Sequence, residues 1–287
     1  MEVKDANGLT QALTSVKPGQ KIVLADGRYQ GAFDARTAAS AEAPILLCGG
    51  SGATLAGDTS GYTLHLDGAN WWTVGGFVIT GGEKGLMVDR TNHATLSALT
   101  VSGTGHEAVH LRSGSSDNVV SGLKVDSTGL TRPEFGEGIY VGSAKDNWCR
   151  YSACQPDTSD RNTVTDNTFG PAVTAENIDI KEGTTGGTVA GNSFNGAGTT
   201  AADSWVDVKG NNWQLTDNRG QDAPKDGMQV HVQLPGWGNG NTFANNNLTV
   251  DAAGYGFRIA KDATGTVVVC NNKASGAAAG LANIPCT

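Results

Sequence analysis

Residues 174–212 read TAENIDIKEGTTGGTVAGNSFNGAGTTAADSWVDVKGNN and contain one short pattern twice, 28 residues apart. The first copy is Ile178-Asp179-Ile180-Lys181 and the second is Val206-Asp207-Val208-Lys209. Because alternate residues of a strand share a face, the apolar pair of each copy points to one side and its Asp and Lys point to the other. Each copy is therefore predicted to be a strand with one buried and one charged side.

The same apolar-x-apolar pattern recurs along most of the chain at intervals of 22 to 39 residues. Its apolar pairs are Leu64/Leu66, Leu86/Val88, Val109/Leu111, Ile139/Val141, Ile178/Ile180, Val206/Val208, Met228/Val230 and Phe257/Ile259. Repeats of this length indicate a solenoid, in which each repeat forms one coil and all coils share a core. Two irregular coils are expected before the regular ones, so we predict one domain of about ten coils over residues 1–287.

A second strand follows in each repeat, and five asparagines fall in one column of these strands. They are Asn167, Asn192, Asn218, Asn246 and Asn271. Stacked at the strand spacing of about 4.8 Å, they would form an internal ladder in which each amide bonds its neighbours. This pattern is typical of an all-β fold, the single-stranded right-handed parallel β-helix.

The N-terminal 20 residues and two insertions depart from the repeat. Asp5 precedes an amphipathic pattern of Leu9, Ala12 and Leu13, which predicts a short N-capped helix that covers the open end of the coils. The insertions at residues 143–160 and 233–240 are predicted to form walls of a groove. They carry the aromatic residues Trp148, Tyr151 and Trp237, which suit sugar rings; that each Trp pins its own loop is an open alternative.

Composition limits the partners. The net charge of −8 argues against nucleic acid and against a basic membrane-binding face, and no apolar run approaches the roughly 20 residues of a membrane span. We expect a monomer. Met1 followed directly by Glu2 indicates that a signal peptide has been removed, and hence an extracellular protein.

The five cysteines give two local pairs and one residue left over. We expect disulfides Cys149–Cys154 and Cys270–Cys286, with Cys48 as a buried free thiol. Both pairings require an oxidising compartment, in agreement with secretion. The alternative is five reduced cysteines in a cytosolic protein.

The charged face can be arranged in two columns. The column between the apolar positions runs His65, Met87, His110, Tyr140, Asp179, Asp207, Gln229 and Arg258, and the next runs Asp67, Asp89, Arg112, Gly142, Lys181, Lys209, His231 and Ala260. Asp would then stack on Asp and Lys on Lys, which destabilises neighbouring strands. A solvated ladder is one interpretation; the favoured one is a cation at the carboxylates or an anionic ligand at the amines. The lysine stack is also predicted to lower the pKa of one lysine, with Asp179 and Asp207 opposing this in part.

These residues resemble the chondroitinase B and alginate lyase family of polysaccharide lyases, which are pectate-lyase-like right-handed β-helices. The family places an acidic residue five positions before a catalytic lysine, as in Glu176-Asn177-Ile178-Asp179-Ile180-Lys181, and an Asn-x-Phe turn follows, as at residues 192–194. Lys209 stands where the family has a catalytic arginine, and Thr174 stands where it has a second acidic metal ligand. The close match covers about 40 residues.

The resemblance implies β-elimination on an acidic, uronate-containing polysaccharide. Calcium neutralises the uronate carboxylate in that family, and the lysine removes the proton at C5. The resemblance implies Lys181 as the base and Lys209 in the place of the assisting arginine, and His231 is predicted as a further catalytic residue. Calcium is predicted to bind Glu176 and Asp179, with Glu137 or Asp207 as a further ligand. The expected substrate contacts are Tyr140, Arg112, His110, Asp207, Trp205, Gln229, Trp237 and Arg258.

Two other functions remain open from the residues alone. Asp179 and Asp207 would lie about 5 Å apart, near the separation used by retaining glycosidases, so a β-helix hydrolase is the first alternative. A non-catalytic protein that binds carbohydrate or cell wall through its aromatic loops is the second. Fold alone does not choose among these, because function depends on the site.

Overall fold

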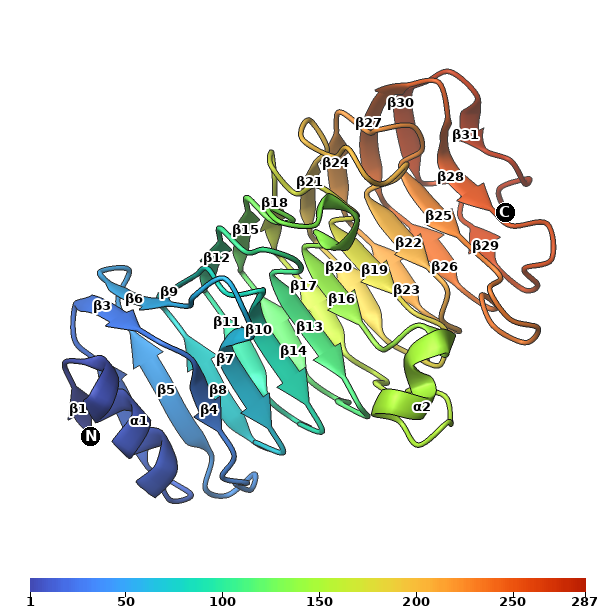
Figure 1. The fold of residues 1–287 in the computed structure, drawn as a ribbon. Coiled ribbons are helices and arrows are strands. Elements are labelled where there is room, and N and C mark those ends of the chain that lie inside the picture. The colour runs from blue at the N-terminus through green and yellow to red at the C-terminus, as the bar shows by residue number, and fades with distance from the viewer.

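Three long parallel sheets run the length of the molecule in the computed structural model, which describes residues 1–287 (Figure 1). Sheet A consists, in spatial order, of β1(Glu2–Val3), β2(Lys21–Leu24), β5(Ile45–Gly49), β8(Trp72–Gly75), β11(Thr95–Ser97), β14(Val119–Ser121), β17(Thr163–Thr165), β20(Thr188–Ala190), β23(Gln214–Thr216), β26(Thr242–Ala244) and β29(Val267–Val268). Sheet B consists of β3(Gly27–Gln30), β6(Ala53–Ala56), β9(Val78–Thr80), β12(Thr100–Ser102), β15(Lys124–Asp126), β18(Thr168–Phe169), β21(Ser193–Asn195), β24(Arg219–Gln221), β27(Asn247–Ala252) and β30(Lys273–Ala277). Sheet C consists of β4(Phe33–Ala35), β7(Tyr62–Asp67), β10(Lys84–Asp89), β13(Val109–Arg112), β16(Ile139–Val141), β19(Ile178–Ile180), β22(Val206–Val208), β25(Met228–Val230), β28(Tyr255–Ile259) and β31(Gly280–Ala282).

After β1, the chain visits sheets A, B and C in turn and then begins again. Sheets B and C have ten strands each, so the molecule has ten coils and is a right-handed parallel β-helix, as predicted. The predicted register of sheet C is also confirmed. Tyr140 pairs with Asp179, Asp179 with Asp207, and Asp207 with Gln229 on successive strands.

Asparagines stack inside the helix, with one change from the predicted set. Asn192 accepts hydrogen bonds from the backbone and side-chain nitrogens of Asn167, and the same pair of bonds repeats up the column to Asn246. The last member is Asn272, not Asn271. Each ladder asparagine immediately precedes its sheet B strand, and β30 begins at Lys273, so the alignment of the last coil was wrong by one residue.

The core is built from apolar strand residues and stacked aromatic rings, and Trp205 is one of these rings. It was expected to contact substrate, but it is fully buried, with its indole stacked 6.3 Å from the ring of Phe194. Gly220 makes room for it, because a Cβ atom there would lie 2.5 Å from the indole. Trp205 ends the turn before β22 and its side chain enters the core, so the substrate-binding prediction is wrong.

The N-terminal end of the β-helix is covered by a short α-helix, as expected. Helix α1(Ala6–Ser15) is capped by Asp5, whose carboxylate accepts from Gly8 N at 2.8 Å, and it buries Leu9 and Leu13 at the first coils.

The disulfides Cys149–Cys154 and Cys270–Cys286 are both present. Cys48 is free but half-buried on β5 rather than fully buried. Among the helices there is none with the length and apolar character that crossing a membrane requires.

The insertion at residues 143–160 folds into η2(Lys145–Asn147) and α2(Trp148–Tyr151), which stand out from the coils in Figure 1. Its Asp157 carboxylate accepts from the backbone nitrogens of Ser113 and Gly114, which fixes the insertion to the preceding coil. Trp148 Nε1 donates to the carbonyl of Ser143 at 2.9 Å. Trp148 therefore pins its own loop, the alternative left open by the sequence.

Candidate active site

The charged face of sheet C is more enclosed than an outward sheet face would suggest. Asp179 is 1% exposed, Asp207 is 6% exposed and Lys209 is 6% exposed. The neighbouring side chains and the turns before each strand cover them. Charges in such a place require partners, because burial of an unpaired charge is costly.

The partners alternate in sign. The Asp179 carboxylate lies between two lysines, with Lys181 Nζ bonded to its Oδ2 and Lys209 Nζ 2.7 Å from its Oδ1. Lys209 also lies 3.1 Å from Oδ2 of Asp207. Asp179 stacks on Asp207 in register as predicted, and the long side chain of Lys209 lies between the two carboxylates and offsets their repulsion.

This pairing also reverses the predicted pKa of the lysine. Burial alone would lower the pKa of Lys181, but the adjacent Asp179 carboxylate outweighs it and raises that pKa above its usual range. The pKa of Lys209 is raised for the same reason. Both lysines are ammonium groups in the resting protein.

A second set of carboxylates lies beside this pair, and it contains all three predicted calcium ligands. Oxygen atoms of Glu137, Glu176 and Asp179 lie within 4.8 Å of one another. Oε2 of Glu137 is buried and has no hydrogen-bond partner. Burial and the neighbouring carboxylates raise the pKa of Glu137 well above its usual range and that of Glu176 to about 8.

The charges of this region do not balance. Four carboxylates face two ammonium groups: Glu137, Glu176, Asp179 and Asp207 against Lys181 and Lys209. The excess of negative charge needs protons or a cation. Hard carboxylate oxygens, one of them without a partner, fit a divalent cation such as Ca²⁺.

Both carboxylate oxygens of Asp207 have partners within the protein. Ser204 Oγ donates to its Oδ1 at 2.7 Å, and His231 Nε2 lies 3.2 Å from its Oδ2. Although burial raises the pKa of Asp207, Lys209 and His231 hold it far below its usual range. Asp207 held in this way suits only the nucleophile of a glycosidase. Asp179 would then have to protonate the leaving group, but both of its oxygens are bound by lysines, so this geometry does not support the pair as a glycosidase.

Tyr140 is the neighbour of Lys181 on the other side. Lys181 Nζ lies 4.7 Å from the centre of the phenol ring, and the ring of His110 lies 4.3 Å away. Burial, Asp179 and Glu137 raise the pKa of Tyr140 well above its usual range. Its hydroxyl makes no hydrogen bond within the protein, so it is a protonated donor that is free to bind a ligand.

Comparison with known proteins places the chain in a family. No protein-family model and no curated protein sequence matches the chain. Among solved structures, an alginate lyase from Paenibacillus sp. str. FPU-7 is 38% identical, with a TM-score of 0.93, and the match covers 99% of this chain and 98% of that chain. The chain belongs to this family of β-helix polysaccharide lyases.

More distant structures share the fold. A variant of the alginate lyase AlyGC, of polysaccharide lyase family 6, is 16% identical to the lyase with a TM-score of 0.65, over 98% of this chain and 40% of that chain. The pectate lyase Pel9A is 14% identical with a TM-score of 0.62, over 96% of this chain and 72% of that chain.

Two residues that were expected to contact substrate, Arg112 and His110, bind other side chains of the lyase instead. The Arg112 guanidinium makes two bonds of 2.9 Å to Asp89 and stacks 3.7 Å from the ring centre of Tyr151. His110 is buried against Glu107. His110 is therefore in the predicted region but without a free polar group, whereas Nη1 of Arg112 lies outside the bonds to Asp89.

The remaining candidates lie on the C-terminal side of the cluster. Arg258 is exposed and lines a cavity of about 260 Å³ together with Gln229, His231, Lys261 and Asn283. The Gln229 amide nitrogen is bound to Asp203 and Asp226 at 2.9 and 3.0 Å. Trp237 is half-buried in the loop of residues 233–240, and no contact of its side chain connects it to the cluster.

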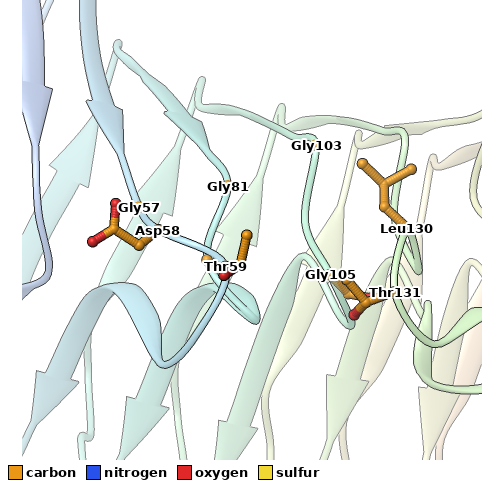
Figure 2. A pocket seen from close by; sticks show the side chains of 9 residues that line it. Gly57, Asp58, Thr59, Gly81, Gly103, Gly105, Leu130 and Thr131 are labelled. Carbon is orange, nitrogen blue, oxygen red and sulfur yellow. The ribbon is translucent and has the colours of Figure 1, made fainter.

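Another cavity of the lyase, of about 530 Å³, lies on the turns between sheets B and C (Figure 2). It is lined by Gly57, Asp58, Thr59, Gly81, Gly82, Gly103, Gly105, Leu130 and Thr131. Asp58 is its one titratable side chain, so this cavity lacks the groups that elimination needs.

Four polar residues beside the site were not predicted from the sequence. Three of them, Glu107, Ser204 and Asp226, each bind the residue three positions later, which is His110, Asp207 or Gln229 of the first column. The fourth is Lys84, which pairs with Glu107. Glu137 and Glu176 occupy the same position in their coils. An acidic or hydroxyl residue three positions before the column is a repeat that the sequence alignment contains and that would have identified them.

Proposed function

We propose that the lyase cleaves an acidic polysaccharide of 4-linked uronates, alginate above all, by β-elimination. The observation that carries the proposal is the position of Lys181 Nζ, 4.7 Å from the ring centre of Tyr140, whose hydroxyl makes no hydrogen bond within the protein. The similarity to an alginate lyase over the whole chain supports the choice of substrate.

Lys181 is proposed to remove the proton at C5 of the uronate. The electron pair of that bond forms the C4=C5 double bond, and the bond from C4 to the leaving oxygen breaks. Tyr140 is proposed to give its phenol proton to that oxygen, because its raised pKa keeps it protonated until a stronger base is present.

Lys181 needs a change in its surroundings before it can accept a proton. Asp179 holds it as an ammonium group in the resting protein, so the lysine becomes a base only when Asp179 is engaged elsewhere. Glu137 and Glu176 form, with Asp179, the cluster that can engage it. A Ca²⁺ ion bound there would supply positive charge and a ligand position for the uronate carboxylate.

Lys209 and His231 are proposed to face the substrate from the next two coils. Lys209 directly follows β22 and His231 directly follows β25, and Asp207 contacts and orients both side chains. An anionic sugar chain lying along sheet C would pass Lys181, Lys209, His231 and then Arg258 on successive coils. The cationic side chains of Lys181, Lys209 and Arg258 along this path suit a polymer with one carboxylate on each residue.

We further propose that the lyase acts outside the cell. Its two disulfides favour an oxidising compartment, and its substrate would be too large to enter the cell. Thiol counting on purified protein from the native source, before and after reduction, tests this by showing whether four of the five cysteines are oxidised.

The experiment that tests the function uses alginate, polymannuronate, polyguluronate, pectate and chondroitin sulfate as separate substrates. Elimination creates an unsaturated uronate that absorbs in the near ultraviolet, whereas hydrolysis creates reducing ends without that absorbance. We expect new absorbance with alginate or one of its blocks, measured with and without chelator. Reducing ends without absorbance on every substrate would overturn the proposal.

A further inference from the structure

His110, on β13, is a buried residue that no step of the proposed reaction uses. Its Nδ1 lies 3.1 Å from Oε1 of Glu107, and its Nε2 lies 2.9 Å from the carbonyl oxygen of Gly142. The residue is 5% exposed. Both partners are acceptors on opposite sides of the ring, so rotation of the ring would lose the buried hydrogen bond that its protonated nitrogen donates, and His110 has one fixed plane.

Glu107 is fixed in turn. It is 4% exposed and forms an ion pair with Lys84 of the preceding coil. Burial works to raise the pKa of Glu107, but His110 and Lys84 hold it well below its usual range, so it stays a carboxylate acceptor. Lys84, Glu107 and His110 thus form a buried chain of polar contacts that spans two coils.

This chain ends against Tyr140. His110 and Tyr140 are register partners on neighbouring strands, and their rings lie 4.3 Å apart at 49°. Gly142, the second partner of His110, follows Tyr140 by two residues. His110 therefore contacts the phenol ring and also bonds to the backbone next to it.

Tyr140 has no other polar restraint. Its hydroxyl makes no hydrogen bond, and Lys181 approaches its ring rather than its oxygen. The direction of the hydroxyl consequently depends on what the ring packs against. A proton donor displaced by about 1 Å can cost a hundredfold in rate.

We propose that His110, held by Glu107 and Gly142, is a positioning residue that fixes the ring of Tyr140 for proton transfer to the leaving oxygen. The inference rests on the proposed function, because it requires Tyr140 to be the donor. It gives the Lys84–Glu107–His110 chain a role in turnover in addition to its role in packing.

The first test is His110→Phe, which keeps an aromatic ring but removes both ring nitrogens and their polar contacts. We expect kcat to fall about tenfold, with KM changed by less than about twofold, because positioning acts on the transition state. The matched control is His93→Phe. The exposed His93 ring stacks on Trp71 at the same 4.3 Å, outside the site, and its loss should leave kcat unchanged.

The decisive test is a double-mutant cycle with Tyr140→Phe. If His110 acts through the phenol hydroxyl, His110→Phe should cause no further loss of the residual kcat in the Tyr140→Phe background. An equal loss in both backgrounds would overturn the inference, because His110 would then act through general structure. Wild-type turnover by Tyr140→Phe alone would instead remove the proposed donor, and the two failures are therefore distinguishable.

Thermal unfolding of each variant separates loss of fold from loss of position. If His110→Phe does not fold, Glu107→Gln takes its place, because it keeps the shape of the side chain and weakens the hold on Nδ1. The same lack of additivity with Tyr140→Phe is expected. Additive losses for Glu107→Gln would contradict the inference in the same way.

Discussion

Nζ of Lys209 lies 2.7 Å from Oδ1 of Asp179, a residue of the preceding coil. The other oxygen of the same carboxylate is bound by Lys181. One carboxylate thus separates two ammonium groups that the sequence alignment places next to each other. The charge of the surrounding carboxylates therefore decides whether Lys181 can lose its proton.

Glu176→Gln is expected to remove a pH-dependent part of the stability. Folding raises the pKa of Glu176 to about 8, mainly through burial and Asp179. A carboxyl group with a raised pKa stabilises the folded state fully below its unfolded pKa of about 4.3, and this contribution is lost as the pH rises through about 8. In chelator, the wild type should lose on the order of a few kcal/mol over this range, and the variant should lose less.

The measurement is urea unfolding at a series of pH values. Glu2→Gln is the control, because its carboxylate is exposed and belongs to no cluster. Parallel curves for wild type and Glu176→Gln would show that Glu176 does not hold a proton in the folded state.

Calcium binding depends on Glu137 if the three carboxylates form the site. Calorimetry should detect Ca²⁺ binding to the wild type, and Glu137→Gln should weaken it by about tenfold or more, because a charged ligand is lost. Glu134→Gln is the matched control, since Glu134 is exposed in η1(Pro133–Phe135) three residues earlier. No heat of binding together with full activity in chelator would exclude the metal from the mechanism.

The fold could be predicted from the sequence because each coil repeats the same buried contacts. Ile178 and Val206 recur at the same place in their coils, and apolar burial and the asparagine ladder both depend on that repetition. The one slip, Asn271 for Asn272, fell where two asparagines are adjacent and either fits the column. Many coils thus carried the same information about the fold.

The site was predictable as a set of residues but not as a set of contacts. Register placed Asp179, Lys181 and Lys209 on one face correctly. It could not show that Lys209 reaches back to Asp179, because a lysine side chain is longer than the strand spacing and its direction depends on all its neighbours. The prediction that Trp205 contacts substrate was wrong for a related reason, because the side chain of a turn residue does not follow the alternation of a strand.

Asn192→Leu is expected to cost at least about 1–3 kcal/mol of stability, because its neighbours lose buried hydrogen bonds. Asn192 donates to Val164 O at 2.9 Å and to Asn218 at 3.0 Å, and it accepts from Asn167. Asn271→Leu, outside the ladder and exposed, should cost much less. Equal costs in denaturant unfolding would mean that the ladder does not contribute as described.

Arg258→Ala is expected to raise KM for long substrates about threefold to tenfold while kcat is unchanged, because an exposed cation at the C-terminal cavity contributes uniform binding. Short oligomers that do not reach β28 should show no change. Arg219→Ala removes an exposed arginine from sheet B and is the control. An equal effect of both substitutions would indicate non-specific attraction to the polyanion.

Lys181→Met is expected to be the most damaging change at the site. Methionine keeps most of the length of the side chain and removes the amine, so turnover should fall on the order of a hundredfold or more, the usual contribution of a positioned base. Lys225→Met is the control, because Lys225 is half-exposed and paired with Asp203. Asp207→Asn separates the mechanisms: a lyase should be weakened, since Lys209 and His231 lose a partner, whereas a retaining hydrolase would be abolished. Wild-type turnover by Lys181→Met with an inactive Asp207→Asn, measured by ultraviolet absorbance and by reducing ends, would reject Lys181 as the base.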